Sequence, residues 1–447
     1  MIRGSVIRGM EMRKRKKHIN LIACLFLMGL LGLWGCGSPS SASATNRKPQ
    51  GLAASRENSG ADQMAETDGQ GAEAGSSETD ELSDGEEIGT ALVYEGSMEL
   101  QYAKHFSVDY YEGGYIMLTT TVDGAKLLVV PEDQPIPAQL DPSVVVLKQP
   151  IDHLYLVASA AMDMFRELEA VDRIRFSGQK EDGWYIEEAK EAMRDGSMLY
   201  AGKYNMPDYE LIVSEGCSLA IENTMISHSP EVLEKLDEFG IPALIDYSSY
   251  ETHPLGRVEW IRFYGALLGK EKEADAAFEK QLELLECVSK EEQANETEYV
   301  GAEMYADPTV AFFYITSNGT VNVRKTSDYV PQMIDLAGGS YIFQDLGSDE
   351  DHKSSVNMTM EQFYAAAKDA DYLIYNSTID GEIRAVEQLL GKSAMLRDFK
   401  AVKEGNVWCT TNDLYQHSMS VGGFILDLHG MLTGDLTQDY QYLYRLK

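Results

Sequence analysis

The sequence predicts an α/β protein with two Rossmann-like α/β lobes joined by a single long α-helix, and with a small N-terminal β-meander. Short apolar strand-like runs alternate with helical runs from about residue 150 to 248, and this alternation restarts after residue 298. Such alternation with short connections is typical of parallel βα units. A helical stretch at 257–293 separates the two series, and 447 residues suffice for two or three globular units.

The N-terminal residues are predicted to form a signal peptide and not part of a folded lobe. A basic cluster at 13–18 precedes an apolar run at 19–35, whose length is typical of a signal peptide and marginal for a permanent membrane span. The small residue before Cys36, and the aliphatic residue three positions before it, indicate lipidation of Cys36. Cys24 fits the short pattern too, but few apolar residues precede it. An uncleaved anchor is the alternative, and both interpretations place the rest of the chain outside the cytoplasm.

The segment that follows is predicted to be a tether. Residues 37 to about 90 are rich in Gly, Ser, Ala and acidic residues and nearly free of aromatics, so they cannot bury enough surface to fold. The sequence therefore divides into a signal peptide (1–35), a disordered acidic tether (36–90), an N-terminal α/β lobe with the meander (91–255), linking helices (256–293) and a C-terminal α/β lobe (294–447).

The N-terminal lobe is expected to begin with the antiparallel meander at 100–133. Aromatic and β-branched residues alternate there, and turns are expected at Gly113-Gly114 and Asp123-Gly124. Strands are then predicted at 154–159, 173–178, 218–223 and 242–248, and helices at 160–171, near 184–195 and at 230–240. Pro230 and Gly240 stand where a helix is expected to begin and end.

The remaining elements belong to the linking helices and the C-terminal lobe. Helices are predicted at 257–269 and 270–293, the second with one apolar stripe. A strand at 299–305 and a hairpin turning at Asn318-Gly319 follow. Further helices are expected at 328–339, 382–391 and 421–432, with a helix and strand unit at 360–376 and a strand at 406–411.

Charge and cysteine content narrow the functional classes. The net charge of -34 argues against nucleic acid, whose phosphates the acidic surface would repel. Cys217, Cys287 and Cys409 lie in apolar contexts, so buried thiols are expected rather than a disulfide framework.

One unit occurs twice, at 209–223 and at 360–376. Each copy opens with a glutamate, Glu210 or Glu361, and closes with an apolar strand that ends in asparagine. Several stretches resemble the class III, helical-backbone substrate-binding lipoproteins of ABC importers, the group that delivers iron-siderophores, haem and cobalamin. They are PDYELIVSEGCSLAIE (207–222), LEKLDEFGIPALI (233–245), WIRFYGALLGKEKEADAAFEK (260–280), MIDLAGGSYIF (333–343) and TMEQFYAAAKDADYLIY (359–375). The meander and the ETHPLGR segment (251–257) are not general to that family.

The resemblance implies an extracytoplasmic solute-binding lipoprotein, not an enzyme, on the outer face of the cell membrane. Its ligand would be a ferric chelate or a corrinoid, with no cofactor, and its partner an ABC permease dimer with a cytoplasmic ATPase. In the family, one glutamate on each lobe meets arginines of the permease, and Glu210 and Glu361 match those positions. Paired carboxylates on two lobes would fix the register on a two-fold partner. The alternative is a pair of ordinary surface glutamates.

Candidate ligand-binding residues are those at predicted loop ends that face a cleft between the lobes. They are Ser159, Met162, Lys203, Tyr204, Asn223, Met225, Tyr250, Arg324, Lys325, Asn376, Tyr415 and His417. Aromatic rings would cover the organic part of a chelate, and the basic pair would bind its acidic groups. Arg324 is the preferred candidate, because adjacent basic residues are unusual in so acidic a chain. An ordinary loop position is the alternative for each.

Three competing functions stay open. A receptor that binds Zn or Mn directly needs converging His and carboxylate ligands, but His153, His228, His253 and His417 lack paired spacing. An enzyme is disfavoured, because GxSxG, HExxH and a Gly-rich phosphate loop do not occur and Cys217 precedes an apolar strand. A surface lipoprotein that binds another protein is the third.

Overall fold

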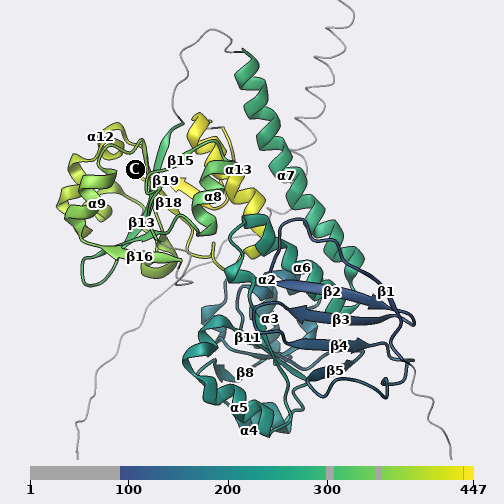
Figure 1. Ribbon diagram of the computed structural model, residues 1–447. Helices are drawn as coiled ribbons and strands as arrows, with labels where there is room; N and C mark the ends of the chain where they lie inside the picture. The colour runs from purple at the N-terminus through teal and green to yellow at the C-terminus, as the bar shows by residue number, and fades with distance from the viewer. Residues whose placement is uncertain (1–90, 299–306, 348–353, 436) are drawn as a thin grey trace, which may run out of the picture. The chain divides into compact units, whose positions relative to one another are not determined.

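The computed structural model describes residues 91–298, 307–347, 354–435 and 437–447 (Figure 1). The predicted signal peptide, Cys36, the tether and the predicted strand at 299–305 lie outside the described residues. Below, the N-terminal lobe means residues 91–255, and the C-terminal lobe means the described residues from 307 onward.

The predicted meander forms the middle of a five-stranded sheet, in which β2 to β5 lie side by side (Figure 1). Its strands, in spatial order, are β1 (Tyr94–Ser97), β2 (Phe106–Tyr111), β3 (Tyr115–Thr120), β4 (Lys126–Val130) and β5 (Val144–Lys148). The first four pair antiparallel, and Gly113 and Gly114 join β2 to β3 at positive φ. β5 pairs parallel with β4 after the loop at 131–143, because parallel pairing requires a crossover.

This sheet packs one face on helix α6 (Pro254–Leu268). The Phe106 ring lies 5.0 Å from the Trp260 ring and 5.4 Å from the Phe263 ring, both edge to face. The opposite face carries a small buried cluster of Tyr115, Met117, Leu128 and Val130.

Two buried carboxylates fix the segment that leads into β2. The side chain of Glu259 accepts the N–H groups of residues 101, 102 and 103, each at 2.8 Å. Glu251 accepts those of residues 104 and 105 at 2.9 Å. Both side chains are buried, and five backbone donors without another partner in the sheet are thereby satisfied.

The predicted βα alternation forms a parallel five-stranded sheet in the N-terminal lobe. Its spatial order is β12-β11-β6-β7-β8, with parallel pairing throughout. The strands are β6 (Leu154–Leu156), β7 (Ile174–Ser177), β8 (Leu199–Tyr200), β11 (Leu219–Asn223) and β12 (Ala243–Asp246). The helices are α2 (Ala161–Glu167), α3 (Glu187–Asp195), α4 (Tyr209–Ser214) and α5 (Pro230–Glu238), with a small hairpin of β9 (Gly202–Lys203) and β10 (Met206–Pro207).

The stretch predicted as linking helices contains two helices. α6 is buried on nearly every side, as a helix that is apolar all round should be. It ends at Gly269, whose φ of 70° turns the chain into α7 (Glu271–Glu298). α7 is the long helix in Figure 1. In the described part of the chain, no helix combines the length and the apolarity needed to cross a membrane.

The C-terminal lobe contains a mixed seven-stranded sheet. Its order is β16-β14-β13-β17-β18-β19, with β15 also on β13. Strands β15, β13, β17 and β18 pair parallel, whereas β14, β16 and β19 are antiparallel. The strands are β13 (Thr309–Ile315), β14 (Val321–Arg324), β15 (Ser340–Tyr341), β16 (Ser355–Met358), β17 (Tyr372–Tyr375), β18 (Val407–Thr410) and β19 (Leu443–Arg445). The helices are α8 (Tyr329–Leu336), α9 (Met360–Ala367), α10 (Ser377–Asp380), α11 (Val386–Lys392), α12 (Lys400–Glu404) and α13 (Val421–Thr433).

A buried carboxylate also fixes the last strand of the C-terminal lobe. Asp427 of α13 accepts the N–H groups of residues 441, 442 and 443 at 2.6 to 3.1 Å. Burial raises its pKa to about 6. Asp427 thus holds β19 as Glu259 holds the entry to β2.

Candidate ligand-binding site

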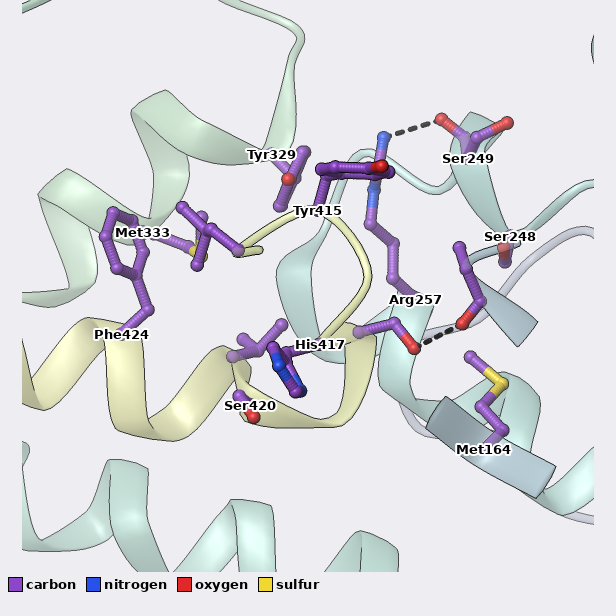
Figure 2. A pocket seen from close by; sticks show the side chains of 14 residues that line it. Met164, Ser248, Ser249, Arg257, Tyr329, Met333, Tyr415, His417, Ser420 and Phe424 are labelled. Carbon is purple, nitrogen blue, oxygen red and sulfur yellow. Dashed lines mark hydrogen bonds between the residues drawn. The ribbon is translucent and has the colours of Figure 1, made fainter. Parts of the chain in front are cut away.

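A cavity of about 70 Å³ is lined by both lobes and by α6 (Figure 2). The N-terminal lobe and α6 contribute Ala160, Met164, Ser248, Ser249 and Arg257. The C-terminal lobe contributes Tyr329, Met333, Leu414, Tyr415, His417, Ser418, Ser420, Val421 and Phe424. Many of these residues follow the carboxyl ends of β6, β12 and β18 closely, which is where α/β sheets bind ligands.

Arg257 and Tyr329 form one side of the cavity (Figure 2). The guanidinium carbon of Arg257 lies 3.7 Å from the centre of the Tyr329 ring, in a cation–π contact. Its Nε donates to the carbonyl of Glu251 at 3.0 Å, and its Nη2 to the carbonyl of Ser249 at 2.6 Å. The guanidinium is therefore held on its aromatic face and at two of its nitrogen atoms.

His417 connects charged groups of both lobes. Its Nδ1 lies 3.8 Å from Oδ1 of Asp163 on α2, and its Nε2 lies 3.3 Å from Oδ2 of Asp413. These carboxylates, Asp163 first, raise the pKa of His417 to about 9, so the ring is protonated at neutral pH. Burial raises the pKa of Asp163, but His417 and Arg166 outweigh it, and the net shift is downward.

The loop at 413–420, called the interlobe loop here, makes further direct polar contacts between the lobes. The buried side-chain amide of Gln416 accepts the N–H of Tyr185 and donates to the carbonyl of Gly183, both at 2.7 Å. Ser418 donates to the carbonyl of Ala160 at 2.7 Å, and the N–H of Met419 donates to Asp163 at 2.8 Å. The same loop thus lines the cavity and holds the lobes together.

Two of the predicted ligand residues, Tyr415 and His417, line this cavity. Ser159 and Tyr250 are chain neighbours of the lining residues Ala160 and Ser249, but do not line it themselves. Met162 is fully buried in the core, because α2 begins at Ala161 and turns this side chain inward. Lys203 and Tyr204 belong to the β9–β10 hairpin and its turn, and Met225 is 47% exposed on a turn after β11.

The two strand-ending asparagines cap helical turns instead of lining the cavity. Asn223 accepts the N–H of Met225 at 2.9 Å, and Asn376 accepts the N–H of Thr378 at 3.2 Å. A side-chain oxygen at this position satisfies a free helical N–H group, which explains the choice of asparagine in both copies.

Arg324 and Lys325, preferred for their charge, also lie off the cavity lining. Arg324 is the last residue of β14 and Lys325 follows it. β14 runs antiparallel to β13 and therefore leads away from the edge where β13, β17 and β18 end. The guanidinium of Arg324 lies 3.8 Å from the buried carboxylate of Asp328, and Lys325 is 4% exposed.

Glu210 and Glu361 occupy matching places in the two lobes. Each is exposed and is the second residue of a helix, α4 or α9, that precedes an interior parallel strand. Asp208 caps α4, and Thr359 caps α9 in a capping box with Gln362. The pKa of Glu361 is lowered by the backbone N–H at the helix start and by Thr359. The two copies differ in the number of residues between the glutamate and the following asparagine, but both glutamates lie at the same position of their helix.

Sequence reasoning missed Arg257, Ser248, Tyr329 and Phe424. Arg257 stands inside an apolar helix, on the segment that departs from the family pattern. His253 caps α6 by accepting the N–H of Leu255, which places Arg257 in the first turn, close to β12. The sequence signal that could have identified Arg257 is a single arginine in the otherwise apolar first turn of a helix.

The geometry also describes the residues on which two competing functions, an enzyme and a direct metal receptor, would depend. Burial raises the pKa of the Cys217 thiol to about 12, so it is protonated at neutral pH and is a poor nucleophile. Among the described residues, no group of three or more His, Cys, Asp or Glu side chains is placed to hold a metal ion.

Comparisons with known proteins found similar lipoproteins and a solved structure with a similar fold. No family model matches the chain. Two uncharacterized lipoproteins of Methanocaldococcus jannaschii are each 25% identical to it, over 71% and 78% of this chain and 77% and 87% of their own. A periplasmic binding protein from Veillonella parvula matches the structure with a TM-score of 0.52 and 18% identity, over 72% of this chain and 99% of that one. The resemblance is confirmed at the level of the fold, which is similar to that of a periplasmic binding protein.

Proposed function

We propose that this protein is an extracytoplasmic, lipid-anchored receptor that captures a metal chelate and delivers it to an ABC permease. The carrying observation is the cavity between two α/β lobes, at the carboxyl ends of strands, in a fold similar to a periplasmic binding protein. The lipoprotein relatives and the N-terminal signal sequence support attachment through Cys36 on the outer face of the cell membrane.

The size of the cavity implies that capture involves movement. Ligand pockets in proteins measure roughly 300–1,000 Å³, whereas this one measures about 70 Å³. A siderophore, haem or corrinoid therefore requires separation of the lobes. The hydrogen bonds of Gln416 and Ser418 would break in that step, and α6 and α7 would limit its extent.

Delivery would use Glu210 and Glu361. Both are exposed at equivalent helix starts, where the helix dipole favours a carboxylate. One glutamate on each lobe suits a permease made of two copies related by a two-fold axis. Neither lines the cavity, so docking and ligand capture are separable.

Binding measurements on the full-length protein in detergent test the proposal. Titration calorimetry is run with a ferric catecholate, a ferric hydroxamate, haemin and cyanocobalamin, and with Zn²⁺ and Mn²⁺ alone on metal-stripped protein. One chelate should bind with a Kd of about 1 μM or tighter. Binding of Zn²⁺ or Mn²⁺ alone would establish the direct-metal alternative, and no binding of any probe would favour a protein-binding lipoprotein.

A further inference from the structure

The cavity differs in charge from the rest of the chain. The protein has 72 acidic and 38 basic residues. The cavity lining nevertheless contains no Asp or Glu among the described residues, and its two charged members, Arg257 and His417, are both basic. A basic lining in so acidic a protein favours an anionic ligand.

The two basic residues differ in how far protein carboxylates neutralise them. His417 lies between Asp163 and Asp413, as described above. The hydrogen bonds that the described structure gives Arg257 go to backbone carbonyls alone. The nearby Asp246 is buried and interacts with Arg257 through its charge, but its hydrogen bonds come from Ser248 N–H and the Tyr264 hydroxyl. Arg257 is therefore the cation in the lining that lacks a bonded carboxylate.

Arg257 is also oriented before a ligand arrives. The Tyr329 ring holds the guanidinium face, and the carbonyl of Ser249 holds Nη2 (Figure 2). The carbonyl of Glu251 holds Nε. An arginine fixed in this way loses little side-chain entropy on binding, and its planar fork fits two oxygens of one anionic group. The rest of the lining supplies serine hydroxyls and an apolar surface of Met164, Met333, Leu414, Val421 and Phe424.

We propose that Arg257 binds an anionic oxygen group of the ligand, and that the ligand is a metal chelate of net negative charge, with catecholate or carboxylate oxygens. This inference rests on the proposed function and specifies the ligand class. The Tyr329 ring and the apolar surface contact the organic part of the chelate, while Arg257 discriminates against neutral and cationic chelates.

The experiment compares chelates of opposite charge around the same metal. The probes are the ferric tris-catecholate of 2,3-dihydroxybenzoate, which is anionic, and ferrioxamine B, which is cationic. The full-length protein should bind the catecholate at least about 100-fold more tightly than ferrioxamine B. Arg257→Met should weaken catecholate binding about 10- to 100-fold, which is the range for loss of charged hydrogen bonds.

Arg384→Met is the matched control. Arg384 also stacks on a tyrosine, at 4.1 Å from the Tyr444 ring, but it is exposed and does not line the cavity. Its replacement should leave catecholate affinity unchanged. If Arg257→Met does not fold, as judged by circular dichroism, Arg257→Lys keeps the charge without the planar fork and should lose about 10-fold.

Separate outcomes overturn the two proposals. Unchanged catecholate affinity in the folded Arg257 variant, or tighter binding of ferrioxamine B by the native protein, overturns the anion site while leaving a chelate receptor. If neither these probes nor haemin and cyanocobalamin bind to the native protein, the proposed function fails and the anion site fails with it.

Discussion

The two lobes place different residues at the same point of an equivalent strand. β11 ends in Glu222 and Asn223, whereas β17 ends at Tyr375 and Asn376 follows it, and both asparagines cap the next turn. The Tyr375 hydroxyl donates to Asp380 at 2.9 Å. Glu222 is fully buried, and neither of its oxygens has a hydrogen-bond partner within the described structure. The two copies of the unit therefore share an asparagine cap and an exposed glutamate, but they differ in the buried residue before the asparagine.

The comparison separates what the lobes share from what each adds. The shared parts, α4–β11 and α9–β17, carry the proposed docking glutamates. The cavity instead takes its charged contacts from the start of α6, which follows β12, and from the interlobe loop, which follows β18. The repeated glutamates thus suit a two-fold partner, whereas the two cations of the cavity, Arg257 and His417, differ in chemistry and in their neighbours.

Charge reversal on the shared unit should have the largest effect. Glu210→Lys with Glu361→Lys is expected to abolish transport, because like charges would face the permease arginines, while chelate affinity stays unchanged. Uptake of radiolabelled iron in cells and calorimetry on purified protein measure the two quantities. Glu231→Lys and Glu387→Lys, exposed acids in the first turns of α5 and α11, are the controls. An equal fall in chelate affinity would show that the glutamates belong to the ligand site.

Removal of a buried anchor carboxylate should cost the most stability. Glu259→Ala leaves three backbone N–H groups without their acceptor and removes one of the partners of Arg262, so it should lower the free energy of unfolding by about 3–5 kcal/mol. Asp427→Ala tests the counterpart in the other lobe and should give a loss of similar size. Urea unfolding followed by circular dichroism measures both. Glu273→Ala, at an exposed site on α7, should change stability by less than about 0.5 kcal/mol. A loss that small for Glu259→Ala would mean that the first sheet is held otherwise.

The difference between Glu222 and Tyr375 should appear in how the free energy of unfolding depends on pH. Burial raises the pKa of Glu222 to about 8 in the folded state, from 4.5 when exposed. The unfolded chain thus releases this proton first as pH rises, so stability due to Glu222 is present below pH 4.5 and is lost as pH rises to about 8. Glu222→Gln should therefore gain about 4 kcal/mol over the native protein at pH 8.5, relative to the same comparison at pH 5.

Tyr375→Phe provides the matched test in the other lobe. It removes one hydrogen bond, to Asp380, and should cost about 1 kcal/mol at both pH values. Urea unfolding at pH 5 and 8.5 gives both comparisons. A constant difference between Glu222→Gln and the native protein at the two pH values would show that Glu222 has a polar partner in solution.

Much of the fold was predictable because it depends on local patterns. Most helices and strands were predicted within a few residues of their bounds. The signals were changes in the spacing of apolar residues, Pro230 at a helix start, and the turns at Gly113-Gly114 and Asn318-Gly319. Pairing between distant segments was not predictable in this way. β5 joins its sheet only after the loop at 131–143, and β16 and β19 extend the second lobe antiparallel.

The site was harder to predict, because strand direction and helix facing decide which loop residues meet. Arg324 has the expected chemistry, but antiparallel β14 carries it away from the edge where the parallel strands end. Met162 has the expected position in sequence, but α2 turns it into the core. Tyr415 and His417 were found because they follow a parallel strand, β18, at its carboxyl end.

The smallest effect is expected where the two lobes meet. Gln416→Ala removes two hydrogen bonds between the interlobe loop and residues 183–185, so the closed state should lose about 1–2 kcal/mol. If the lobes must part before a chelate enters, its association rate should rise roughly 5- to 30-fold. Stopped-flow fluorescence of the buried Trp184, next to the broken contacts, follows the event. Gln388→Ala also removes two amide contacts, but within α11 and the residues before it, and should leave the rate unchanged. An unchanged association rate in Gln416→Ala would mean that the chelate enters without breaking the contact of Gln416. Other pairs would then hold the lobes closed, and the contacts of Asp163 with His417 and Met419 would be the first to test.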